Sequence, residues 1–187
     1  DLRKLALEHS ITTYETGKQN KGWKGFVLER LAGLQTNISK APNGLSWELK
    51  SVSFHEVKGQ LVPKETMAIT MINPEELKAH SFFESHCWAK LKAIVFCAVE
   101  WEGKNAKGGK LLKVASLDFA EDDELIQEIK VDYDFIRNKL ITQGFEALTG
   151  ADGKWIQART KGPGHGSVSR AFYARTVLVK RIFEIAS

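Results

Sequence analysis

Glu48 and Lys50 lie two residues apart in the stretch LSWELKSVSF (45–54), where apolar and polar side chains alternate. Residues i and i+2 of a β-strand project from the same face, so this carboxylate and this ammonium can point at one substrate atom. Phosphodiester hydrolysis needs such a set, because carboxylates hold a divalent ion and a cation positions water or offsets developing charge. A Glu-x-Lys pair is also common as a surface ion pair, so the pair alone does not decide its role.

Two neighbouring features favour the chemical interpretation. Asn43, in the turn at 42–44, occupies the position where nucleases of the PD-(D/E)-x-K type carry an aspartate just before the strand. Glu29 lies in an otherwise apolar helical stretch, where an acid either faces solvent or points at a site. An amide offers Mg²⁺ one neutral oxygen where this ion prefers an anionic ligand, so Asn43 should slow hydrolysis by roughly 10³-fold or more. Either Asn43 replaces an aspartate of the active enzyme, or the chain is a naturally non-catalytic DNA-binding domain.

A glycine-rich, basic loop, TKGPGHGSVSR (160–170), connects two expected strands. It has neither the Lys-Ser/Thr of a P-loop nor the glycine spacing of a dinucleotide-binding turn. Such a loop can fold over DNA and bring polar side chains to phosphates or base edges; these are Arg159, Lys161, His165, Ser169 and Arg170. An ordinary flexible surface loop is the alternative.

Other chemistries find less support. His80, His86 and Cys87 are close in sequence, but no second Cys/His pair completes a zinc site. Neither Cys87 nor Cys97 sits in a nucleophile turn, and both have apolar neighbours, so we expect buried free thiols in a reducing cytosol. The acidic run EDDE at 121–124 is typical of a helix N-terminus.

The composition is that of one globular domain. The chain has 187 residues, 43% hydrophobic and 27% charged, with a formal charge of +4 that mildly favours a polyanionic partner. No apolar run is long enough to span a bilayer, so we expect no membrane partner and a cytoplasmic location in a bacterium or archaeon. Because the chain opens at Asp1 without methionine, we expect a processed product or an excised domain.

The order of elements predicts one α/β domain with a central mixed β-sheet flanked by α-helices. We expect a turn at 55–64 and Gly144 as the stop of the clearest helix. Strands are predicted at 45–54, 65–72, 92–103 (central in the sheet), 110–119, 153–160 and from 170. Helices are predicted within 1–16 and at 26–34, 73–91, 120–144 and toward 185.

Six segments in order resemble the core of the MutH-like endonucleases, that is, the mismatch-repair nicking endonuclease MutH and its restriction-enzyme relatives. They are KGWKGFVLERLAG (21–33), PNGLSWELKSVSF (42–54), KETMAITMINP (64–74), SHCWAKLKAIVF (85–96), GKWIQARTKG (153–162) and SRAFYARTVLVKRIF (169–183). The resemblance implies a restriction-endonuclease-like fold for a single domain, residues 1–187. It covers most of the chain.

The resemblance also implies roles for single residues. Glu48 would be a metal-binding carboxylate, Lys50 the catalytic lysine, and Glu29 and Lys90 supporting groups of the same centre. Asn43 stands where that family has an acid. The family's DNA-contacting positions are matched by Lys21, Arg159, Lys161 and Tyr173. With Mg²⁺ as the cofactor, the metal ligands would be Glu48, the residue at 43 and a main-chain carbonyl near Leu49.

We therefore expect a Mg²⁺-dependent, sequence-specific endonuclease that cuts double-stranded DNA, inactivated by Asn43. A type II restriction enzyme is favoured over a strand-nicking repair enzyme, because the acid loop is shorter than in MutH and the glycine-rich loop differs. We expect a monomeric domain; fusion to another DNA-recognition domain, or a role as effector of a modification-dependent enzyme, stays open.

Overall fold

A computed structural model describes residues 1–15, 18–20, 22–34, 42, 46–101, 103, 109–161 and 168–186. Within these ranges, no helix is both long and apolar enough to cross a membrane. The helices are α1 (Leu2–Glu8), α2 (Trp23–Leu31), α3 (Pro74–Ala79), η1 (Phe82–Glu84), α4 (His86–Ala89), α5 (Glu124–Gln143), η2 (Phe145–Ala147) and α6 (Thr176–Ile185). The strands are β1 (Tyr14–Glu15), β2 (Lys18–Gln19), β3 (Glu48–Val57), β4 (Gln60–Pro63), β5 (Met67–Met71), β6 (Ala93–Glu100), β7 (Leu111–Asp118), β8 (Ile156–Thr160) and β9 (Arg170–Ala174).

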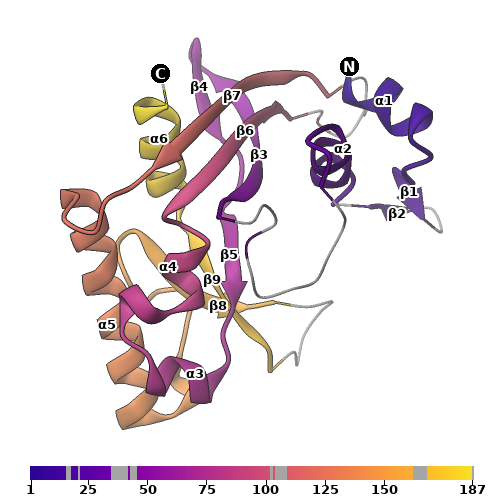
Figure 1. Cartoon of the computed structure of the whole chain (residues 1–187). Coiled ribbons are helices and arrows are strands. Elements are labelled where there is room, and N and C mark those ends of the chain that lie inside the picture. The colour runs from indigo at the N-terminus through magenta and orange to yellow at the C-terminus, as the bar shows by residue number, and fades with distance from the viewer. Residues whose placement is uncertain are drawn as a thin grey trace.

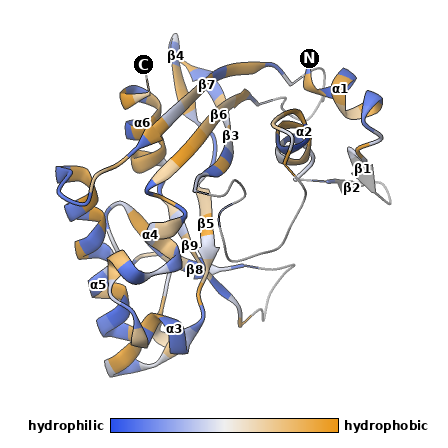
Figure 2. Cartoon of the chain, viewed as in Figure 1, coloured by the Kyte–Doolittle hydropathy of each residue, from blue (hydrophilic) through white to orange (hydrophobic). Residues whose placement is uncertain are grey.

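The larger sheet has four strands in the order β4-β3-β6-β7. Strands β3 and β6 run parallel, with Glu48 opposite Ile94 and Phe54 opposite Glu100, whereas β4 and β7 pair antiparallel to them. The sheet is therefore mixed, and its inner strand β6 is hydrophobic along almost its whole length (Figure 2). The predicted mixed sheet, with β6 central, is confirmed.

The two faces of this sheet pack against different helices. On one face, Leu49 joins Cys97 and Val99 in a core that α1 and α2 cover. On the other face, Val52 and Phe54 join a larger core that includes α6. Figure 1 shows α2 and α6 on opposite sides of the strands. Helices thus flank the sheet, as predicted for a restriction-endonuclease-like fold, and the alternation of β3 puts Glu48 and Lys50 on the α6 side.

A second, antiparallel sheet of three strands, in the order β5-β9-β8, carries the hairpin that the sequence predicts to contact DNA. Helix α5 packs along this sheet and supplies seven buried residues, among them Ile129 and Tyr133. Asp123 caps its N-terminus, and Gly144 ends it with φ +87°, a conformation that favours glycine. The helix predicted at 120–144 is confirmed with the predicted stop.

Two local predictions are wrong. Residues 55–64, expected as a turn, extend β3 and form strand β4, and only Lys58 and Gly59 turn, both with positive φ. The single helix expected at 73–91 is three short pieces, because the chain is extended at Ser81 and Ser85. The Glu84 carboxylate accepts hydrogen bonds from the main chain and hydroxyl of Ser81, which starts a new turn there.

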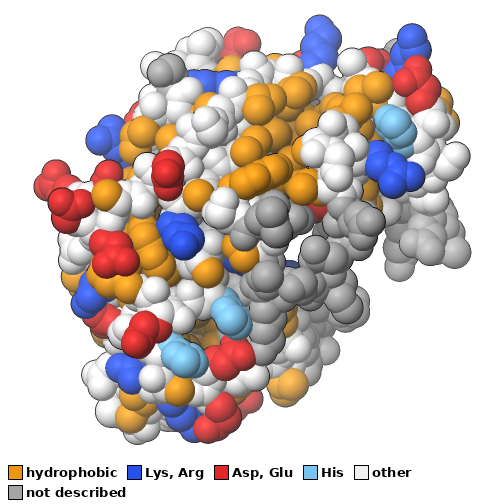
Figure 3. Space-filling model, in the orientation of Figure 1, with side chains coloured by type: hydrophobic (Ala, Val, Ile, Leu, Met, Phe, Trp, Pro, Cys, Tyr) orange, Lys and Arg blue, Asp and Glu red, His pale blue; other side chains and the backbone are white. Residues whose placement is uncertain are grey.

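Hydrophobic side chains also gather on one exposed face. Figure 3 shows them over the region of the four-stranded sheet, where Leu112 and Val114 of the outer strand β7 are exposed. Surface patches of this kind occur on many monomers, and this patch lies on the α2 side of the sheet, away from Glu48 and Lys50.

Candidate active site

Glu48, Lys50 and Lys90 form one compact charged cluster. The Lys50 ammonium donates to Glu48 Oε1 at 2.9 Å, and the Lys90 ammonium lies 3.3 Å from the same oxygen. All three side chains are largely withdrawn from solvent, with 5% of Glu48 and 12% of each lysine exposed. The structure thus brings together three of the predicted catalytic residues, from strand β3 and from the end of α4.

Two ammonium groups, those of Lys50 and Lys90, lie against the carboxylate of Glu48. Burial lowers the pKa of the Lys50 ammonium; Glu48 counteracts this, while the positive charges of Lys90 and Lys161 lower it further. The effect of Lys161 means that this residue, directly after β8, lies near the cluster. Ammonium groups gathered in this way are suited to a phosphate, which brings negative charge with it.

A second hydrogen bond holds Lys50 from the other sheet. Its ammonium donates to the main-chain oxygen of Ile69, on β5, at 3.2 Å. Ile69 could not be predicted from the sequence, because a main-chain acceptor can belong to any residue type. Only the packing of β5 beside β3 brings this oxygen to the lysine.

The described residues offer two of the kinds of oxygen donor that Mg²⁺ prefers. Glu48 supplies a carboxylate, and Leu49 supplies a main-chain carbonyl on the same strand. In the described part of the chain, no group of three or more His, Cys, Asp or Glu side chains could hold a metal. Mg²⁺ commonly binds one or two carboxylates together with waters and substrate phosphates, so a full protein cage is not required.

Glu29 lies on a helix and not on the strand that carries Glu48 and Lys50. It lies on α2, one turn after Gly25, which packs so closely on β3 that an added Cβ would lie 3.6 Å from the Ser51 hydroxyl. Ser51 projects from the face of β3 opposite to Lys50. Glu29 is half-buried on the helix that covers that other face, and its role in the centre stays a prediction.

The hairpin β8–β9 presents several of the predicted DNA contacts. Arg159 is exposed, lies over the ring of Tyr173 at 4.9 Å, and donates to the Thr66 hydroxyl at 3.2 Å. Lys161 and Ser169 are also exposed, and the Lys161 main chain donates to the Ser169 carbonyl, which continues the hairpin beyond its strands. These four predicted residues therefore belong to one surface.

Arg170 is the exception. Its side chain is buried, and its guanidinium donates to the carbonyl of Leu148 at 3.0 Å and to Glu146 at 3.4 Å. It also lies over the ring of Phe145. These contacts favour a structural role for Arg170, which anchors β9 to the segment that follows α5. Lys21, Asn43 and His165 lie outside the described residues.

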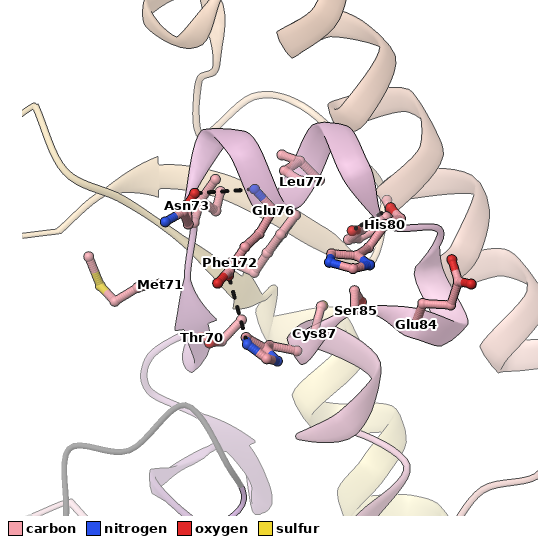
Figure 4. A pocket seen from close by; sticks show the side chains of 13 residues that line it. Thr70, Met71, Asn73, Glu76, Leu77, His80, Glu84, Ser85, Cys87 and Phe172 are labelled. Atoms are coloured by element: carbon pink, nitrogen blue, oxygen red, sulfur yellow. Dashed lines mark hydrogen bonds and ion pairs between the residues drawn. The ribbon is translucent and has the colours of Figure 1, made fainter.

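A pocket of about 250 Å³ lies between β5, α3, α4 and α5 (Figure 4). Cys87 and Tyr133 line its inner part, and the Glu76–His86 pair, 3.8 Å apart, lines its mouth. Burial raises the pKa of the Cys87 thiol far above its ordinary value and that of Cys97 to about 11. Both cysteines are free and buried, as predicted, and neither is activated as a nucleophile.

Comparisons with a family model and with known proteins both find MutH. A family model described as the DNA mismatch repair enzyme MutH matches residues 35–128. The DNA mismatch repair protein MutH of Escherichia coli O127:H6 is 25% identical over 181 residues, covering 93% of this chain and 75% of that protein. The MutH proteins of Escherichia coli O17:K52:H18 and of Shigella flexneri serotype 5b are each 24% identical with the same coverage.

Proposed function

Because the chain belongs to the MutH family of DNA mismatch repair enzymes, we propose that it is the catalytic domain of a Mg²⁺-dependent endonuclease that cleaves double-stranded DNA at a short specific sequence. One observation carries the proposal: two ammonium groups converge on a single oxygen of the buried Glu48, beside a hairpin of exposed basic residues. That arrangement combines groups for hydrolysis with groups for binding a polyanion.

Each residue has a role in the proposed mechanism. Bound Mg²⁺ would polarise the scissile phosphate and lower the pKa of an attacking water. Glu48, the Leu49 carbonyl and the residue at 43, as an aspartate, would hold this ion. Lys50 holds the water in line with phosphorus, and Lys90 orients the Glu48 carboxylate and offsets the negative charge that develops on the phosphate.

DNA binding is assigned to the β8–β9 hairpin. Lys161 would contact a phosphate close to the cluster, since its charge already acts on Lys50. Arg159 and Tyr173 stack on each other at the hairpin, and a guanidinium held on an aromatic ring is preorganised for a base edge or a phosphate. We propose that Asn43 keeps this chain inactive, because the metal site lacks one anionic ligand.

The Asn43→Asp protein tests the proposal. Incubated with supercoiled plasmid and Mg²⁺, it should cut the DNA at one short sequence, whereas the unchanged chain and an Asn43→Asp, Glu48→Gln double variant should bind DNA without cutting it. Omitting Mg²⁺ should stop cleavage. If the reverted protein binds DNA and cuts no site on methylated or unmethylated plasmid, the chain is a non-catalytic DNA-binding domain.

The number of strands cut separates two forms of this function. The shortened acid loop and the glycine-rich loop favour a restriction enzyme that cuts both strands. The named relatives are DNA mismatch repair proteins, which favours cleavage of one strand in repair. Linear plasmid as the first product would support the restriction enzyme, and open-circular plasmid that persists would support the nicking enzyme.

A further inference from the structure

Strand β5 contains one residue more than its partner at the point where it meets the active site. Ala68 lies opposite Tyr173 and Thr70 lies opposite Phe172, which leaves Ile69 without a partner on β9. This is the pattern of a β-bulge, in which an extra residue redirects the local backbone. The Ile69 side chain is 3% exposed and belongs to the large core, so the bulge is held firmly in place.

The carbonyl of this extra residue is the one that accepts from Lys50. Strand β5 is an edge strand of its sheet, so a carbonyl directed away from β9 meets no further strand of that sheet. Lys50 belongs to the other sheet, and the bond at 3.2 Å therefore joins the two sheets across the site. A lysine side chain has four rotatable bonds. The hydrogen bond to Glu48 on the same strand is not enough to fix all of them.

We propose that Ile69 is a positioning residue whose bulged carbonyl fixes the direction of the Lys50 ammonium for the reaction. The inference rests on the proposed function for its catalytic consequence, but the contact itself exists without it. The bulge directly follows Ala68, the partner of Tyr173, so one strand both fixes the lysine and pairs with the DNA-binding hairpin. Loss of the contact should slow the chemical step and leave DNA affinity unchanged.

An amide-to-ester change tests the carbonyl without altering a side chain. Replacing Thr70 by its α-hydroxy acid makes the Ile69 carbonyl an ester oxygen, which is a weaker acceptor. The matched control replaces Ala68 by lactic acid, which weakens the Met67 carbonyl on the same strand. Both proteins also carry Asn43→Asp. We expect the Thr70 ester to cut DNA about tenfold more slowly in single turnover, and the Ala68 ester to cut within twofold of the parent, with both binding DNA equally.

A double-mutant cycle that measures stability to urea accompanies the cleavage assay, and it does not require an active enzyme. The urea midpoint should fall on introducing the Thr70 ester when Lys50 is present and fall less when Lys50→Met has already removed the ammonium. The Ala68 ester should lower the midpoint equally in both backgrounds. Equal behaviour of the two esters in the cycle, or an unchanged cleavage rate in the Thr70 ester, overturns the inference. If coupling is present but the Asn43→Asp parent does not cut DNA, the proposed function fails and the contact stands.

Discussion

The ammonium of Lys90 and the ammonium of Lys50 share a single oxygen, Glu48 Oε1. Lys90 comes from the end of the short helix α4, whereas Glu48 and Lys50 share strand β3. The carboxylate therefore keeps a cation when either lysine is removed. Removing one lysine should therefore change the cleavage rate without a large change in the free energy of unfolding.

Lys90→Met should reduce cleavage by the Asn43→Asp protein about 10²-fold, because one preorganised charge is lost from the centre. The free energy of unfolding should change by less than about 1 kcal/mol, since Glu48 stays paired with Lys50. Single-turnover cleavage and urea denaturation measure the two effects. Lys92→Met, at an exposed position two residues on, is the control and should leave both quantities unchanged. A loss of activity that is matched by a loss of stability would contradict the assignment.

DNA binding should depend steeply on salt, and Lys161 should account for part of that dependence. Removing one phosphate contact by Lys161→Ala should reduce the slope of log K against log salt by about 1. Fluorescence anisotropy with a duplex at several salt concentrations gives the slope. Lys180→Ala, on α6, removes the same charge from an exposed position that pairs with Glu184 and should leave the slope as it is. Identical slopes for both variants would exclude the hairpin as the phosphate-binding surface.

Gly153 should tolerate alanine poorly. An added Cβ would lie 2.1 Å from the Ile156 carbonyl oxygen, and φ is +79°. Gly59 has the same φ of +79° but open space around its Cβ position, so Gly59→Ala isolates the backbone strain, about 1–2 kcal/mol. We expect Gly153→Ala to cost at least about 2 kcal/mol more, measured as the free energy of unfolding. Equal costs at the two positions would show that the chain relaxes around Gly153.

Asp152 should make stability depend on acid pH. Burial alone would raise its pKa, but hydrogen bonds from Lys139 at 2.7 Å and from the Thr149 main chain at 2.8 Å outweigh burial and hold the pKa below its ordinary value. The stabilisation is therefore fully present above the unfolded-state pKa of about 3.9 and is lost as the pH falls through the lower, folded-state pKa.

Asp152→Asn should accordingly lower the free energy of unfolding by about 1–3 kcal/mol at pH 7, and the difference from the parent should narrow below about pH 4. Urea denaturation at pH 7 and at pH 3.5 measures it. Asp118→Asn, at an exposed position on β7, should show no such narrowing. A constant difference at both pH values would mean that the Asp152 charge contributes nothing.

The larger elements could be predicted from the sequence because their patterns are long. The 20 residues of α5 have a cap at Asp123 and a stop at Gly144, and β6 is apolar in all but its last residue. Strand β4 was missed because it has only four residues and ends in Pro63, which is tolerated at a sheet edge. The break in the helix predicted at 73–91 could have been found, since Ser81 and Glu84 have the spacing of a capping box.

The site was predictable where spacing along one strand fixes geometry, and not where separate elements meet. Glu48 and Lys50 follow from strand alternation, whereas the approach of Lys90 was implied by family resemblance alone. Arg170 was assigned to DNA because its type suits phosphate, but burial against Leu148 and Glu146 engages it elsewhere. The Ile69 carbonyl could not be foreseen, because its position depends on a register irregularity between β5 and β9.

The start of the β8–β9 hairpin is held to helix α5 by hydrogen bonds. The Asp132 carboxylate on α5 accepts hydrogen bonds from three successive main-chain amides where β8 begins, those of Lys154, Trp155 and Ile156. Sequence changes farther out along the hairpin therefore leave its root unaltered. Under the proposed function, a chain built in this way could change the DNA sequence that it prefers through the hairpin, while the proposed hydrolytic residues on β3 and at the end of α4 stay the same.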